Sequence, residues 1–303
     1  MPYHLLFPLF SSVCFVLGMM LAKQAINRGV TPWTGTFLGN LWLALFWGTI
    51  ALVRGEIIPT EAWSAAAIVG ALFVLGQVFT YLTFQVGDVS VATPIFGVKV
   101  LMVAGLTSVL DGTDVPWSIW IAGALASAGV ILIQWQSRKD KSHEDTVTAA
   151  AAKNRWLTIV LALCAAFSLS LFDVCLQKWA RGWSGYSFLP VMFGTAGILS
   201  LGLLPWVTFP RRIKKLKAGR WILGGTLLMA LQAMSMCFSL AEYQDAPRIN
   251  IVYASRGLWG VLLAWAFARR LGTKEAHVGR TVMLRRLAGA ILLTAAVLMA
   301  IQA

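Results

Sequence analysis

QVGDVSVATPIFGVK, residues 85–99, and EYQDAPRINIVYASR, residues 242–256, align with each other without a gap, and each ends in a basic side chain. The matched pairs include Asp88 with Asp245, Thr93 with Asn250, Phe96 with Tyr253, and Lys99 with Arg256. Both cations lie inside apolar segments long enough to cross a bilayer. A cation at the centre of a membrane helix costs about 2.5 to 3.5 kcal/mol on insertion scales, so it normally faces a polar cavity or a partner. The two stretches therefore predict a repeated membrane fold with a polar pathway at its centre.

The composition around these stretches is that of a membrane protein. Of 303 residues, 58% are hydrophobic and 12% are charged, about half the roughly 25% charge of soluble domains. A membrane helix needs about 20 mainly apolar residues, and the sequence contains ten such stretches. They run approximately over residues 4–25, 35–53, 64–86, 90–110, 116–136, 155–177, 187–208, 220–242, 248–268 and 283–302. We therefore expect an all-α integral membrane protein with ten transmembrane helices.

The placement of charge predicts an orientation and argues against nucleic-acid binding. The net charge is +13, but the basic residues cluster in the short connections between the apolar stretches. Connections on one side carry 19 of the 25 Lys and Arg residues, and those on the other side carry four. By the positive-inside rule, the rich side is cytoplasmic and both termini lie outside.

The ten stretches divide into two halves. Residues 137–154 form a long hydrophilic linker, which leaves five stretches in residues 1–136 and five in residues 155–303. Because five is odd, the second half enters the membrane in the opposite sense, so we expect an inverted repeat. Inverted repeats favour a substrate site at their interface, near the bilayer midplane, with alternating access by rocking.

This arrangement resembles the drug/metabolite transporter superfamily, and its EamA-type members in particular. The likeness is clearest over residues 87–136, where DVSVATP at residues 88–94 opens a segment after a short connection. The chain departs from the family pattern in two ways. The family usually has Gly-Glu at two positions where this chain has Leu110-Asp111-Gly112 and Arg270-Leu271-Gly272-Thr273. Family termini are also more often cytoplasmic, whereas the charge pattern here predicts termini outside. The resemblance implies a multi-pass transporter of the plasma or inner membrane. Sugar-phosphate exchangers of the superfamily hold an anionic group with basic residues at positions similar to Lys99 and Arg256.

The two cations and their neighbours are the predicted substrate site. Pro94 removes a backbone donor five residues before Lys99, and Gly97 thins the helix beside it, so both are predicted hinge positions. At helical spacing Asn250, Tyr253 and Arg256 share roughly one face. The arginine fork suits a carboxylate or a phosphate. Structural alternatives are a snorkelling Lys99 and an ion pair of Arg256.

Three further polar residues lie deep in the apolar stretches. Asp173 is either a proton carrier, because burial raises a carboxyl pKa, a fixed counterion of Arg256 or Lys178, or a residue at the end of its span. Gln77 and Tyr81 are spaced to share a helix face, where they either line a wet cavity and contact substrate or join neighbouring helices.

The function we expect is secondary transport of a small organic metabolite, anionic or zwitterionic, such as an amino acid, an organic acid or a phosphorylated compound. The sequence has no HExxH, CxxC or Walker A motif, so we expect neither an enzyme nor a cofactor, with proton coupling left open. The expected partners are the metabolite and the lipid bilayer, for a monomer or a homodimer. The alternatives are a membrane-embedded enzyme, a regulatory subunit, or a cation channel or carrier, although central positive charge disfavours a cation pathway.

Overall fold

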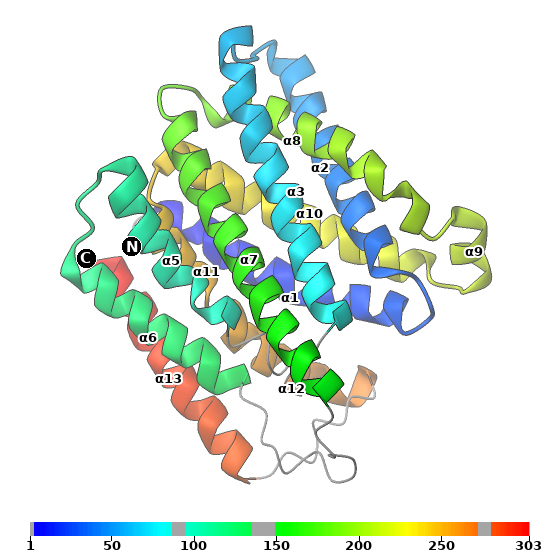
Figure 1. The fold of residues 1–303 in the computed structure, drawn as a ribbon, viewed down its shortest axis with the longest axis vertical. Helices are drawn as coiled ribbons and strands as arrows, with labels where there is room; N and C mark the ends of the chain where they lie inside the picture. Colours follow the sequence, from blue (N-terminus) through cyan, green and yellow to red (C-terminus); the bar gives the residue numbers. More distant parts are fainter. Residues whose placement is uncertain (1–2, 87–94, 135–148, 272–279, 303) are drawn as a thin grey trace.

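The computed structural model describes residues 3–86, 95–134, 149–271 and 280–302, and the regular structure in these ranges is helical (Figure 1). The longer helices are α1 (Leu6–Ile26), α2 (Pro32–Arg54), α3 (Trp63–Val86), α5 (Lys99–Leu106), α6 (Trp117–Gln134), α7 (Ala149–Ala180), α8 (Gly185–Ser200), α10 (Gly219–Tyr243), α11 (Ala246–Tyr253), α12 (Arg256–Leu271) and α13 (Arg280–Gln302). Short turns of helix are η1 (Tyr3–Leu5), η2 (Thr60–Ala62), η3 (Thr107–Asp111), η5 (Leu201–Trp206) and α9 (Pro210–Lys215).

Seven of the described helices are long and apolar enough to cross a membrane, and Trp117–Ile133 is a shorter apolar helix. These eight coincide with eight of the ten predicted stretches. The other two predictions, 90–110 and 248–268, do not give single long helices among the described residues, because the chain turns at Val98 in the first and at Ala254–Ser255 in the second. The count of ten spans is therefore not confirmed by length and composition alone.

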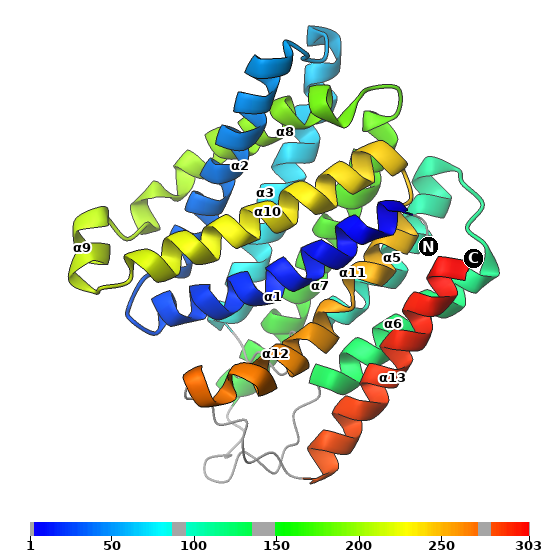
Figure 2. The ribbon, with the colours of Figure 1, turned by 180° about the vertical axis from the view of Figure 1, so that it is seen from behind.

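The helices pack in pairs that join the two halves of the sequence. α1 packs along α10, α3 along α7, α2 along α8, and α6 along α13, as Figures 1 and 2 show from opposite sides. Glycines allow the closest approaches, since a Cβ on Gly129 would lie 2.8 Å from the backbone oxygen of Gly289. Similarly, a Cβ on Gly18 would lie 3.1 Å from the oxygen of Gly225. Small residues at such contacts let helix backbones approach in lipid.

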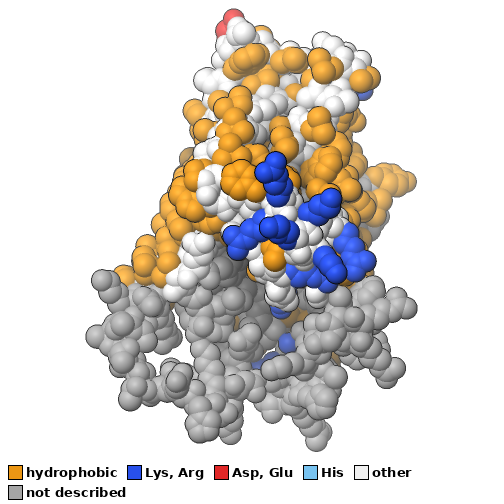
Figure 3. Space-filling view, turned by 90° about the vertical axis from the view of Figure 1, so that its right-hand side faces the viewer, with side chains coloured by type: hydrophobic (Ala, Val, Ile, Leu, Met, Phe, Trp, Pro, Cys, Tyr) orange, Lys and Arg blue, Asp and Glu red, His pale blue; other side chains and the backbone are white. Residues whose placement is uncertain are grey.

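The surface is largely apolar. Leu52, Ile198 and Trp117 are 85%, 68% and 81% exposed, and Figure 3 shows hydrophobic side chains covering much of one face, with Lys and Arg gathered in one cluster. Extended apolar surface of this kind suits contact with lipid.

The basic cluster marks one end of the molecule, which we call the basic end. There the α1–α2 turn meets the connection between η5 and α10, and the Thr31 amide donates to the Thr208 hydroxyl at 3.0 Å. We call the opposite end the N-terminal end, because it holds His4, 3.5 Å from the carboxylate of Asp245. The candidate site lies on helices that run between these two ends.

Candidate functional site

Lys99 and Arg256 each open a helix directly after an interruption. Residues 95–97 are helical, the chain turns at Val98, and α5 then begins at Lys99. In the second half α11 ends at Tyr253, and α12 begins at Arg256 after a two-residue turn. At the second break the N–H groups of Gly257, Leu258 and Trp259 donate to the carbonyls of Ala254 and Ser255, so the first donors of α12 have partners in the turn.

Lys99 is neutralised by a buried carboxylate. Its Nζ lies 2.7 Å from Oδ2 of Asp173 on α7, and the Lys99 and Asp173 side chains are 13% and 2% exposed. Sequence reasoning named Arg256 or Lys178 as the partner of Asp173, and the structure places Lys99 there instead. The reason is that α5 packs against α7. Lys178 donates to the Leu110 carbonyl at 2.7 Å.

Arg256 has aromatic neighbours. Its guanidinium carbon lies 4.5 Å from the ring centre of Tyr253 and 4.9 Å from that of Phe15 on α1. Within the described ranges, no ion pair joins Arg256 to a carboxylate, and α1 contains no Asp or Glu. The predicted pairing of Tyr253 with Arg256 on one face is confirmed. The amide of Asn250 donates to the Ala246 carbonyl at 3.0 Å, so it has a backbone partner within α11.

The Lys99–Asp173 pair and the Tyr253–Arg256 pair occupy one region. α11, which carries Tyr253, packs against both α5 and α7. The structure therefore brings together Lys99, Asp173, Tyr253 and Arg256.

Gln77 and Tyr81, predicted to contact substrate, instead join α3 to neighbouring helices. Asn40 on α2 donates to Gln77 at 2.8 Å and receives a bond from the Gln77 amide at 3.2 Å. Asn40 also donates to the Ser200 hydroxyl at 2.7 Å. The Tyr81 hydroxyl is hydrogen-bonded to Thr36. Of the two readings that the sequence allowed, the contacts support interhelical bonding.

The predicted hinge falls beside the first interruption. Gly97 directly precedes Val98, and a Cβ at this position would lie 3.2 Å from Cγ1 of Val130 and 3.4 Å from the backbone oxygen of Ser127. Glycine thus allows the turn before α5 to pack closely on α6. Pro94, the other predicted hinge residue, lies outside the described residues.

Comparison with known proteins finds a family model that matches part of the chain. Residues 2–135 match the model of the EamA-like transporter family, which is part of the drug/metabolite transporter superfamily. This first part of the chain is therefore similar to that family. None of the curated proteins searched matches the chain. A solved structure titled "Crystal structure of protein" is similar over 97% of this chain and 96% of its own, with a TM-score of 0.65 and 14% identity, which shows a shared fold.

The match over residues 2–135 suggests a multi-pass membrane transporter of the drug/metabolite type, and members of the matched family are transporters rather than enzymes. In the part of the chain that the structure describes, no group of three or more His, Cys, Asp or Glu side chains could hold a metal ion. The four cysteines are free.

A polar network closes the N-terminal end of this EamA-like chain. Asp111, whose side chain is 1% exposed, accepts from Gln177 at 2.8 Å and from Arg181 at 2.6 Å. The Ala246 amide donates to Gln177 at 2.6 Å, which ties in the α10–α11 connection. Burial raises the pKa of Asp111, but the bonds from Gln177, Thr113 and Arg181 and the charge of Arg181 bring that pKa below its ordinary value. Sequence reasoning did not assign this network, although it noted Asp111 as a departure from the family pattern.

Proposed function

We propose that the protein is a secondary transporter that moves a small organic metabolite carrying a carboxylate or phosphate group, anionic or zwitterionic, across a cell membrane by alternating access. The observation that carries the proposal is the state of Arg256. It is a permanent, partly buried cation at the start of α12, and the described residues offer it two aromatic rings and the Tyr253 hydroxyl but no carboxylate.

The chemistry of Arg256 favours an anionic substrate group. A guanidinium presents two parallel N–H donors to a carboxylate or phosphate, and such bonds are strengthened where the local dielectric is low. The rings of Phe15 and Tyr253 would hold the guanidinium in position, and the donors that the Tyr253 hydroxyl does not take up would be left for the substrate. A cationic substrate would be repelled by the same group.

Lys99 and Asp173 would form the second part of the site. In the structure the Asp173 carboxylate is paired with Lys99, with 2.7 Å between Oδ2 and Nζ. Either a substrate anion or a proton on Asp173 would weaken this pair and release Lys99. Proton coupling through Asp173 is thus a chemical route for linking transport to a proton gradient.

The helix packing supports ten spans in two inverted repeats. If the halves are equivalent, α1 corresponds to α7 and α3 to α10, so the α1–α10 and α7–α3 contacts are one contact seen twice. The α2–α8 and α6–α13 contacts each pair a helix with its own equivalent. This is the pattern expected around a two-fold axis in the membrane plane. The Asp111 network would then be the closed gate at the N-terminal end, with access from the basic end.

The test is counterflow in proteoliposomes with a panel of labelled anionic and zwitterionic metabolites. Arg256→Gln should weaken the apparent affinity for the exchanged substrate by more than about 30-fold, because a buried charged hydrogen-bond donor is lost. Arg256→Lys should recover only part of it, since Lys lacks the planar fork. Arg54→Gln is the matched control, because Arg54 pairs with Glu56 at the surface, at 45% exposure.

Unchanged exchange in Arg256→Gln would remove Arg256 from the site. If no metabolite of the panel exchanges and the purified protein modifies lipids, the transporter proposal is wrong and the protein is a membrane enzyme.

A further inference from the structure

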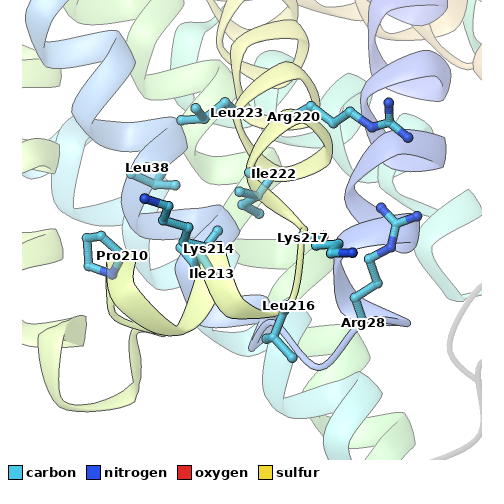
Figure 4. Close-up of a pocket in the computed structure, with 11 residues that line it drawn as sticks. Arg28, Leu38, Pro210, Ile213, Lys214, Leu216, Lys217, Arg220, Ile222 and Leu223 are labelled. Atoms are coloured by element: carbon cyan, nitrogen blue, oxygen red, sulfur yellow. The ribbon is translucent and has the colours of Figure 1, made fainter.

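A large basic cavity lies at the basic end, away from Lys99 and Arg256. Its volume is about 910 Å³, and Figure 4 shows the side chains around it. The lining residues are Arg28, Leu38, Pro210, Ile213, Lys214, Leu216, Lys217, Gly219, Arg220, Ile222 and Leu223. They come from the end of α1, from α2, from α9 and the turn after it, and from the start of α10. The transport mechanism proposed above uses none of them.

Four cations line this cavity, and none of its lining residues is acidic. The guanidinium groups of Arg28 and Arg220 both lie over the ring of Trp221, at 4.8 and 4.7 Å. One terminal nitrogen of Arg28 is buried without a hydrogen-bond partner among the described residues. A buried charged donor without a partner is costly. The cavity therefore has positive charge that no acidic lining residue balances, and a negative group would satisfy it.

The cavity lies where the apolar helices end. Arg28 follows the candidate span Tyr3–Ile26 by two residues, and Gly219 begins the span Gly219–Tyr243. Trp206 and Phe209, just before α9, are 56% and 71% exposed. Aromatic side chains at span ends are typical of the membrane–water interface. This depth is that of phospholipid headgroups.

The walls of the cavity combine charge with apolar surface. Figure 4 shows Arg28, Lys217 and Arg220 on one side and Lys214 on the other, with Ile213 and Ile222 between them. Cations at headgroup level next to apolar helix surface match a molecule with a phosphate at one end and hydrocarbon at the other. A small soluble anion would use the cations and leave the apolar wall uncovered.

We propose that this cavity binds the phosphate headgroup of an acidic phospholipid from the adjoining leaflet. Arg28, Lys217 and Arg220 hold the phosphate, and the apolar side chains of α10 contact the upper part of the acyl chains. By the positive-inside rule this leaflet is the cytoplasmic one.

Lys217 provides an independent argument and a sharp variant. Its φ is +50°, in the left-handed region that glycine adopts without strain and lysine does not. The position directly follows the C-cap of α9, where glycine is the usual residue. A lysine here adds charge to the cavity against its backbone preference. Lys217→Gly should therefore remove the charge while relaxing the turn.

The experiment compares lipid retention by the full-length protein in phosphatidylcholine nanodiscs with and without one fifth phosphatidylglycerol. After extraction into detergent, bound lipid is counted by native mass spectrometry. Wild type should retain phosphatidylglycerol in preference to phosphatidylcholine. The Arg28→Gln, Lys217→Gly double variant should retain about 30-fold less, since each surface cation contributes about one factor of five. The Arg54→Gln, Arg248→Gln double variant also removes two positive charges, but away from the cavity, and it should retain phosphatidylglycerol normally.

Equal retention by both double variants, or no preference for phosphatidylglycerol in wild type, would overturn the proposal. Inorganic phosphate is added in a parallel arm, and if it displaces phosphatidylglycerol at millimolar concentration, the site is one for a free anion. Gel filtration and the thermal midpoint report folding, and Lys217→Gly alone should keep or raise the midpoint while lowering retention. Arg256→Gln should retain lipid normally. The lipid proposal can therefore fail while the transport proposal stands, and the transport proposal can fail while the lipid proposal stands.

Discussion

The two interrupted helices place a cation at the same point in each half of the molecule but give it different surroundings. Lys99 meets Asp173 at 2.7 Å, whereas Arg256 meets the rings of Phe15 and Tyr253 at 4.9 and 4.5 Å. One break is electrically neutral, and the other keeps its charge. Equivalent positions in a repeat can thus diverge in function while the backbone arrangement stays similar.

The cause of the difference lies in the opposite half of the chain. The first broken helix packs on α7, and the second packs on α1. α7 carries Asp173, while α1 contains no Asp or Glu. Each half therefore sets the charge of the other half's cation, which suits a site at a repeat interface.

The largest expected effect comes from breaking the neutral pair. Asp173→Asn leaves Lys99 as an uncompensated buried charge, and we expect a loss of about 3 to 5 kcal/mol in unfolding free energy. Arg256→Met removes the cation–ring contacts and the hydrogen bond to the Tyr253 hydroxyl but leaves no buried charge unpaired, and we expect about 1 to 2 kcal/mol. The measurement is equilibrium unfolding in detergent. Lys99→Met combined with Asp173→Leu should recover most of the loss, because an apolar pair of similar volume replaces the ion pair.

Equal destabilisation by Asp173→Asn and Arg256→Met would mean that the two breaks do not differ in charge. Failure of the double variant to recover would place the cost in packing rather than in the unpaired lysine.

The sequence predicted the equivalence of Lys99 and Arg256, because a cation in an apolar segment is visible without any knowledge of packing. It also placed a hinge at Pro94 and Gly97, beside the first interruption at Val98, but it did not predict the second interruption, since no proline lies at Ala254–Ser255.

Partner assignments failed for a related reason. The sequence suggested Asp173 as an ion-pair partner of Arg256. Asp173 lies on α7, and which helix packs against α7 depends on the arrangement of the whole chain. Spacing alone left Gln77 either as a cavity residue or as a link between helices, and its partner Asn40 lies 37 positions away on α2. Spacing predicts which residues share a helix face, but it does not predict what that face meets.

A second prediction would make the two breaks alike. Phe15→Glu places a carboxylate on α1 where Phe15 now lies against Arg256, so the second cation gains the kind of partner that Lys99 already has. If Arg256 holds the substrate anion, its apparent affinity in counterflow should fall by about 30-fold, in line with the loss of one charged contact. Phe15→Gln, of equal size and no charge, should change it by less than about threefold.

Equal effects of Phe15→Glu and Phe15→Gln would assign the loss to the missing ring rather than to the added charge. In that case the comparison between the two breaks would survive as a structural fact, but Arg256 would have no electrostatic role in binding.

The smallest expected effect concerns the outer anchor of the helix that Lys99 opens. Because the folded-state pKa of Asp111 is lowered, its contribution to stability is present above the ordinary Asp value of about 3.9 and is lost as the pH falls through the lower folded value. Arg181→Gln should bring the two pKa values closer and flatten this part of the pH profile. Arg181 is 47% exposed, so solvent screening keeps the change below about 1 kcal/mol. The measurement is the unfolding free energy between about pH 6 and pH 2 for wild type and Arg181→Gln, with Arg54→Gln as the control. A profile that stays as steep in Arg181→Gln as in wild type would mean that Arg181 does not anchor this end, and that the neutral break is held by Asp173 alone.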